Sequence, residues 1–154
     1  YTRVGSSAAS DVYKRQDLHR IGGKYTDSWH LSHFYDPQAM NEKSIMPKYQ
    51  WLIKNKLDKT MTEKKMEAMV SLGVPYSPDE IEKAQASMLA QGTQIEENLY
   101  SDPDFVASYE ADKATAGEEF VEMRNREIVA MIAYLQRLGT DIKVKAIINE
   151  TAQN

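Results

Sequence analysis

The feature that most constrains the fold is an apolar helical stripe close to the C-terminal end of the chain. Its members follow the i, i+3, i+4, i+7 spacing that places side chains on one face of an α-helix: Ile128, Met131, Ile132 and Leu135. We expect this helix over about 118–138, with Gly139 ending it. Because strand-like alternation of apolar and polar residues is found nowhere in the sequence, the chain is predicted to be all-α.

A short helix followed by a long loop is predicted in the first third of the chain. A turn-rich entry, in which Gly22-Gly23 supplies a flexible point, leads to Thr26 or Asp27 as a helix cap. This helix stops before Pro37. Residues 37–58 lack sustained periodicity, so we expect a long ordered loop there, and such loops in compact domains are usually functional.

Two helices are indicated in the middle of the chain. The first is capped by Thr62 and ended by Gly73. The second begins at a capping box at Ser77, with proline at its first helical position, and runs to about Tyr100. Residues 101–117 are polar and contain an Asp-Pro pair, so we expect a loop with at most one short helical turn.

Composition excludes several classes of protein. The 154 residues suit one domain, and 19 Lys and Arg against 23 Asp and Glu give a net charge of −4, which argues against nucleic acid as a partner. The sequence has no cysteine, so it offers no disulfide, thiolate ligand or thiol nucleophile. No stretch approaches the roughly 18 apolar residues that a membrane span needs.

The two ends of the chain differ from the rest. Residues 1–16 are small and polar, and they resemble translated sequencing adaptor, so we expect this segment to be non-native. On that interpretation the native chain was cut immediately before Asp17. Residues 141–154 are interpreted as a polar tail.

The segment that carries most chemical information is Ser44-Ile45-Met46-Pro47-Lys48-Tyr49. A Met-Pro pair followed by an aromatic residue, in a long loop before a terminal amphipathic helix, resembles c-type cytochromes. In that class the loop methionine gives its thioether sulfur to haem iron, which raises the reduction potential. Most of the eight methionines are interpreted as core packing, whereas Met46 is the candidate iron ligand because of its neighbours.

Longer segments are similar to the mono-haem subunit of cbb3-type cytochrome c oxidase. They are DLHRIGGKYTDSWHLSHFYDP, SIMPKYQWL, MEAMVSLGVPY and EIVAMIAYLQRLGTDIK, in the family's order. The resemblance implies a cytochrome c-like domain over 17–140, with a variable helical insertion at about 77–125. The Cys-x-x-Cys-His haem-attachment motif of that family is missing, so the domain is interpreted as incomplete in its N-terminal half.

The resemblance also implies which residues contact haem c. Two aliphatic side chains pack on the ring and a basic residue, where the family more often has arginine, approaches a propionate. Ser44 can reach a propionate as well, and two aromatic residues wall the haem edge. For the residues other than Met46, plain packing is an equal alternative, and Met46 itself would merely pack if the chain were a haem-free module. The complete set is Met46, Leu18, Ile21, Lys24, Ser44, Ile45, Pro47, Tyr49 and Trp51.

The three histidines are weighed separately. His30 and His33 stand three residues apart on a predicted helix, a spacing that can bind a metal, but no third ligand is evident. We expect them to face the haem-side core, a partner or solvent. His19 could supply the missing axial ligand only in a rearranged fold.

The function implied by the resemblance is electron transfer, without bond chemistry by this chain. Electrons would pass from a periplasmic donor or the di-haem subunit to the oxygen-reducing catalytic subunit. Attachment to the bacterial inner membrane would come from a missing N-terminal anchor or a fused subunit, with the haem domain on the periplasmic side. Two alternatives stay open: a c-type cytochrome domain of another complex or a soluble carrier, and a haem-free helical interaction module.

Overall fold

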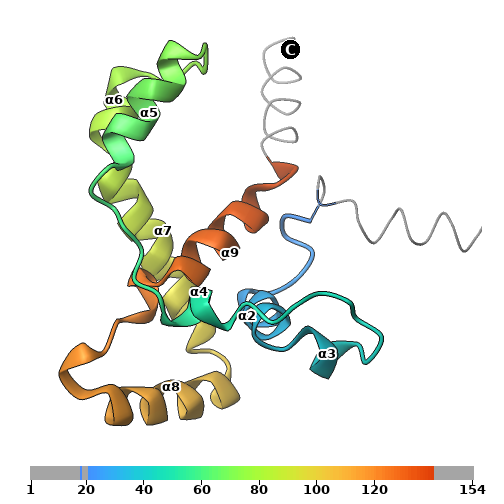
Figure 1. Cartoon of the computed structure of the whole chain (residues 1–154). Coiled ribbons are helices and arrows are strands. Elements are labelled where there is room, and N and C mark those ends of the chain that lie inside the picture. Colours follow the sequence, from blue (N-terminus) through green and yellow to red (C-terminus); the bar gives the residue numbers. More distant parts are fainter. Residues whose placement is uncertain (1–17, 19–20, 141–154) are drawn as a thin grey trace, which may run out of the picture. The chain divides into compact units, whose positions relative to one another are not determined.

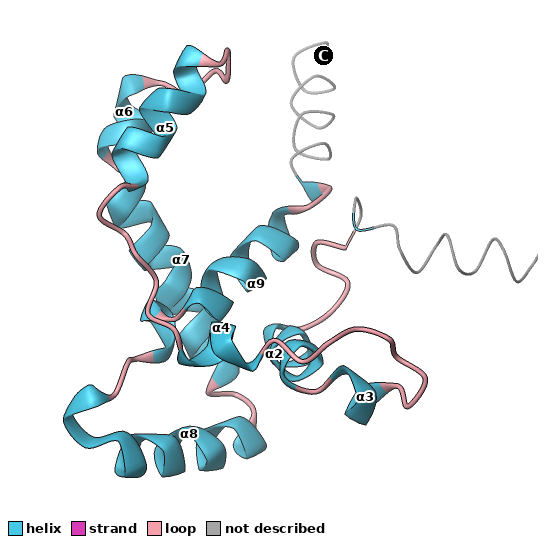
Figure 2. Cartoon of the chain, viewed as in Figure 1, coloured by secondary structure: helices cyan, strands magenta, loops and turns pink. Residues whose placement is uncertain are grey.

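The computed structural model describes residue 18 and residues 21–140. Within these residues every regular element is a helix (Figures 1 and 2), and β-type pairing is limited to an isolated bridge between Lys56 and Arg126. The prediction of an all-α chain is therefore confirmed for the described part. Segments 1–16 and 141–154, with Asp17 and His19, lie outside it.

The chain divides into two compact units. The larger unit comprises residues 27–133, and the smaller unit comprises 1–26 together with 134–154. The described helices, in chain order, are α2 Asp27–Tyr35, α3 Pro37–Met40, α4 Gln50–Lys54, α5 Thr62–Ser71, α6 Pro78–Glu82, α7 Ala84–Leu99, α8 Pro103–Ala116, the 3₁₀ turns η2 Gly117–Glu119 and η3 Met123–Asn125, and α9 Glu127–Arg137.

The predicted short helix is α2, whose first residue is Asp27, so that Thr26, one of the two expected cap positions, directly precedes it. The predicted loop over 37–58 is interrupted by α3 and α4, so that prediction is wrong in part. The reason lies at Asp36, whose side chain accepts hydrogen bonds from the backbone N–H groups of Gln38 and Ala39, with Pro37 at the first helical position. An Asp-Pro pair is thus a helix start here rather than a loop marker.

The helices of the middle segment follow the sequence pattern with two corrections. Thr62 is the first residue of α5 and not its cap, because its hydroxyl donates to the Lys59 carbonyl at 2.9 Å. The capping box at Ser77 is present, but the helix it starts breaks at Lys83 into α6 and α7. Helices α5 and α6 lie against each other and against α7 (Figure 1).

The prediction of a loop over 101–117 is wrong, because this segment forms the 14-residue helix α8. The Asp102 carboxylate accepts from the N–H groups of Asp104 at 3.0 Å and Phe105 at 3.4 Å, and proline follows at the first helical position. Phe105 and Tyr109 then occur one helical turn apart, and both are buried. The Asp-Pro pair starts the helix that these two aromatic residues anchor.

The last helix begins at Glu127, nine residues later than the predicted Glu118. Residues 117–126 instead form two 3₁₀ turns joined by extended backbone. In a helix over this segment the Met123 N–H would bond to a carbonyl four residues earlier. It donates to the Tyr109 hydroxyl at 3.0 Å instead, so the chain takes a different path.

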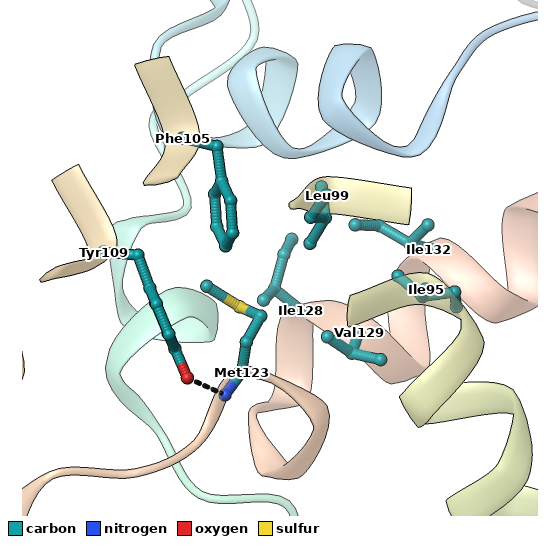
Figure 3. Close-up of a cluster of buried hydrophobic side chains, with 8 residues drawn as sticks. All are labelled: Ile95, Leu99, Phe105, Tyr109, Met123, Ile128, Val129 and Ile132. Atoms are coloured by element: carbon teal, nitrogen blue, oxygen red, sulfur yellow. Dashed lines mark hydrogen bonds between the residues drawn. The ribbon is translucent and has the colours of Figure 1, made fainter. Parts of the chain in front are cut away.

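The core of the larger unit lies where the end of α7, α8, η3 and α9 meet (Figure 3). Its buried cluster consists of Ile95, Leu99, Phe105, Tyr109, Met123, Ile128, Val129 and Ile132. Five of these eight residues (Ile95, Leu99, Phe105, Tyr109 and Met123) come from 77–125, so this segment is central to the packing. Its status as an insertion into the family's domain stays a prediction.

Arg126 joins three segments of the larger unit around that core. Its guanidinium is buried and donates to the Val121 carbonyl at 2.8 Å, the Ile53 carbonyl at 3.2 Å and the Asp112 carboxylate at 2.7 Å. It also lies 5.6 Å from the ring centroid of Tyr109. A buried charge held by this many acceptors fixes the route of the chain around it.

The smaller unit is organised around a close backbone approach at Gly22. A Cβ atom on this residue would lie 2.4 Å from the Gln136 carbonyl oxygen and 2.6 Å from that of Leu138, so glycine is required. The Gly22 N–H donates to the Leu138 carbonyl at 3.0 Å. The Gln136 side chain accepts from the Gly23 N–H and donates to the Tyr25 carbonyl, both at 2.9 Å. Gly22 therefore serves packing and not the flexibility expected of it.

Candidate functional site

Met46 lies on the segment between α3 and α4, here called the Met46 loop (residues 41–49). The C-terminal end of this loop is tied to the end of α2 and to Asp36, the residue that follows α2. The Lys48 ammonium lies 2.5 Å from the Asp36 carboxylate, and the Tyr49 N–H donates to the Phe34 carbonyl at 2.9 Å. The rings of Phe34 and Tyr49 are in edge contact, with centroids 5.8 Å apart. The loop is therefore closed at its base and ordered.

Hydrogen bonds inside the loop hold the backbone on the N-terminal side of Met46. The Ser44 N–H donates to the Asn41 carbonyl at 2.8 Å, and the Met46 N–H donates to the Ser44 hydroxyl oxygen at 3.3 Å. The Gln38 side chain reaches the Ser44 carbonyl at 3.5 Å. Ser44 was expected to contact a propionate, and that role stays a prediction. Because the Ser44 hydroxyl oxygen is the acceptor in its bond with the Met46 N–H, its O–H group can still donate to another acceptor.

The side chains beside Met46 differ sharply in exposure. Met46 is half-buried, whereas Ile45 is 100% exposed and Pro47 is exposed. Tyr49 is half-buried and contacts Trp51, with ring centroids 5.1 Å apart, and Trp51 is 52% exposed. The loop, together with Trp51 in α4, thus presents apolar side chains that the described part of the chain leaves exposed.

The Asp36 carboxylate of this ion pair is held in its ionised form by its hydrogen bonds. The hydrogen bond from Lys48 is the main cause that lowers the pKa of Asp36 below its usual value, and the Ala39 and Gln38 N–H groups act in the same direction. The carboxylate therefore stays ionised at neutral pH. Sequence reasoning did not identify Asp36 and Lys48 as partners. The available signal was an acidic residue directly before the predicted loop and a basic residue two positions after Met46.

Three predicted haem contacts lie in the smaller unit. Leu18 is 53% exposed, Ile21 is half-buried and Lys24 is exposed. They are linked by backbone hydrogen bonds, from the Ile21 N–H to the Leu18 carbonyl at 3.2 Å and from the Lys24 N–H to the Ile21 carbonyl at 3.0 Å. Their contact with a haem ring and a propionate stays a prediction.

The two histidines of α2 lie in an aromatic cluster with Trp29. His30 is 1% exposed, and the His33 ring stacks on Trp29 with centroids 4.7 Å apart. Burial lowers the pKa of both histidines, which favours neutral imidazoles. The Nδ1 atom of His33 is buried and lacks a hydrogen-bond partner in this structure. Among the described residues no three His, Cys, Asp or Glu side chains gather at metal-binding distances.

The helical structure of the described residues agrees with the all-α fold class of cytochrome c-like proteins. The family model of the cytochrome c oxidase mono-haem subunit, FixO, matches residues 13–142. The chain belongs to this family. Its members are subunits of a cytochrome c oxidase, so other oxidase subunits are the partners of the family. No curated protein matches the chain.

The residues of the Met46 loop fit the haem that this family carries. The thioether is a soft ligand suited to haem iron, and exposed Ile45 and Trp51 offer apolar surface that a haem ring would cover. The Nδ1 atom of His33, also in the larger unit, is buried and has no hydrogen-bond partner. The chain contains no cysteine, so it provides no thiol for a covalent haem link. In the described residues, none of the helices has the length and apolar character to cross a membrane.

Proposed function

We propose that this chain is the electron-transfer haem c subunit of a cbb3-type terminal oxidase and relays electrons to the oxygen-reducing subunit. The observation that carries the proposal is the family match over residues 13–142, which includes the whole Met46 loop. The family's single haem favours a haem-bearing domain over a haem-free helical module.

Met46 is the proposed axial ligand of the iron. Haem iron, when bound, supplies a one-electron couple, and thioether ligation favours its reduced state. The chain's own contribution is to present the Met46 sulfur from a loop closed at its base. Exposed Ile45 and Trp51 would cover ring surface and exclude water, while Ser44 and Lys24 would offer hydrogen bonds to propionates.

The proposal extends to the assembly. The partners are the catalytic subunit and the di-haem cytochrome subunit of the oxidase. The haem domain faces the periplasm, and attachment to the inner membrane is through an N-terminal anchor or a fused subunit beyond the helices described here. The subunit itself makes and breaks no covalent bonds.

The test compares Met46→Ala with Met40→Ala in the full-length, haem-loaded subunit. Met40 is the nearest other methionine and is 41% exposed at the end of α3, so it serves as a matched control. We expect Met46→Ala to abolish the sulfur-to-iron absorption band at the red end of the spectrum and to lower the reduction potential. Met40→Ala should leave both unchanged. Retention of the band in Met46→Ala would overturn the ligand assignment.

A second test addresses the covalent link. Sequencing the parent gene upstream of the codon for Asp17 should find a Cys-x-x-Cys-His motif within a few dozen codons, preceded by a membrane span. A cleavable signal peptide in place of the span would favour a soluble carrier. An intact gene that starts at Tyr1 without such a motif would overturn covalent haem attachment.

A further inference from the structure

One carboxylate joins the end of α2, the start of α3 and the Met46 loop. The Asp36 Oδ1 atom accepts from the N–H groups of Gln38 at 3.2 Å and Ala39 at 3.3 Å, which caps α3. The Oδ2 atom pairs with the Lys48 ammonium at 2.5 Å. The Asp36 N–H in turn donates to the Ser32 carbonyl at 2.9 Å, so the carboxylate is itself anchored to α2.

Lys48 is close enough to Met46 in the chain to control its position. Only Pro47 separates the two residues, and the proline ring fixes its own φ, one of the backbone torsions that lie between them. On its other side Lys48 adjoins Tyr49, whose N–H is bonded to α2. Holding the Lys48 side chain therefore limits how far the Met46 backbone can move away from its place.

The same pair contributes little to folding. The Lys48 and Asp36 side chains are 46% and 29% exposed, and ion pairs in contact with water add little to stability. An effect on Met46 can therefore be separated from an effect on the fold.

We propose that the Lys48–Asp36 ion pair is a clamp that holds Met46 on the haem iron. The proposal rests on the function proposed above, in which Met46 is the axial ligand. Lys48 and Asp36 are positioning residues, because neither touches the iron. Without the clamp the loop samples conformations in which the sulfur has left the iron, and an external ligand then binds in its place.

The test measures the displacement of Met46 by added imidazole in the ferric, haem-loaded full-length subunit. The variants are Lys48→Gln, Asp36→Asn and the double change, with Lys43→Gln as a control on the same loop. Asn at position 36 keeps an oxygen to cap α3 and removes only the charge. Each single variant should bind imidazole about two- to five-fold more tightly, as expected for the loss of an exposed ion pair.

The double variant decides whether the two residues act together. A clamp requires that the double variant bind imidazole no more tightly than either single variant, while Lys43→Gln equals the unchanged protein. The proposal is overturned if Lys48→Gln equals Lys43→Gln, or if the effects of the single variants multiply in the double variant. Met46→Ala distinguishes a failure of the ligand assignment from a failure of the clamp. If it keeps the sulfur-to-iron band, the ligand assignment fails; if it loses the band while Lys48→Gln has no effect, only the clamp fails.

Discussion

Removal of the Arg126 guanidinium should destabilise the larger unit far more than removal of its acidic partner. Arg126 donates to two backbone carbonyls, at 2.8 Å on Val121 and 3.2 Å on Ile53, and these acceptors would lose a charged donor. At roughly 1.5–2 kcal/mol for each of the two bonds to a charged group, plus about 1 kcal/mol for the contact with aromatic rings, Arg126→Ala should lower the free energy of unfolding by about 4–5 kcal/mol.

The Asp112 side chain is 52% exposed, so water can solvate the carboxylate and screen the ion pair. Asp112→Ala should therefore lower the free energy of unfolding by only about 0.5–1 kcal/mol. Arg126→Lys keeps the charge but not the fork of donors, and should recover less than half of the loss in Arg126→Ala. The assay is urea unfolding of the full-length subunit followed by far-UV circular dichroism. Equal losses in Arg126→Ala and Asp112→Ala would refute the reasoning, because they would make the ion pair the source of stability.

Three further predictions concern other parts of the chain. Tyr109→Phe should lower the free energy of unfolding by about 1–2 kcal/mol, since the hydroxyl accepts from the buried Met123 N–H. Burial raises the pKa of Tyr109 to about 12, so the free energy of unfolding should fall as pH rises from 10 towards 12. Circular dichroism follows the stability and ultraviolet absorbance follows tyrosinate formation, and Tyr109→Phe should reduce the fall. Burial lowers the pKa of His30 and His33 below 6.5, so stability should be retained above that pH and decline beneath it; a stability profile that is flat below 6.5 would contradict this. Gly22→Ala should lower the melting temperature, since its Cβ would meet backbone oxygen at 2.4 Å, whereas Gly23→Asn, with a φ of 72° and open space, should be tolerated.

The sequence predicted those elements whose signals are local. The capping box at Ser77 and the apolar stripe around Ile128 and Ile132 are determined by neighbours within two helical turns, and both occur in the structure. The helix α8 escaped prediction although its signal is also local. Its Asp102-Pro103 start was interpreted as a loop, and its two buried aromatic residues were not weighed against the polar residues around them.

Other features depend on contacts between residues far apart in the sequence. The late start of α9 follows from the Tyr109 hydroxyl, which takes the N–H of Met123 fourteen positions away. From the sequence, Arg126 resembles an ordinary charged residue of a helix. Its structural role depends on the Ile53 carbonyl, which lies 73 positions away in the sequence. For the candidate site, Met46 is a prediction from its motif, and its role as iron ligand stays a prediction. The ion pair between Asp36 and Lys48 was not predicted, because it depends on how the chain folds back between them.

Helices α5 and α6 contain no buried residue, whereas Ile128 and Ile132 of α9 are fully buried. Opening α5 and α6 would expose little additional apolar surface, so the free energy of that local opening should lie well below that of global unfolding. Their amide protons should exchange with deuterium early. The amide of Ile132, which lies inside α9 and has a fully buried side chain, should exchange only when the larger unit unfolds as a whole. The helical content of this chain therefore does not measure its stability, because part of it can be lost while the core remains intact.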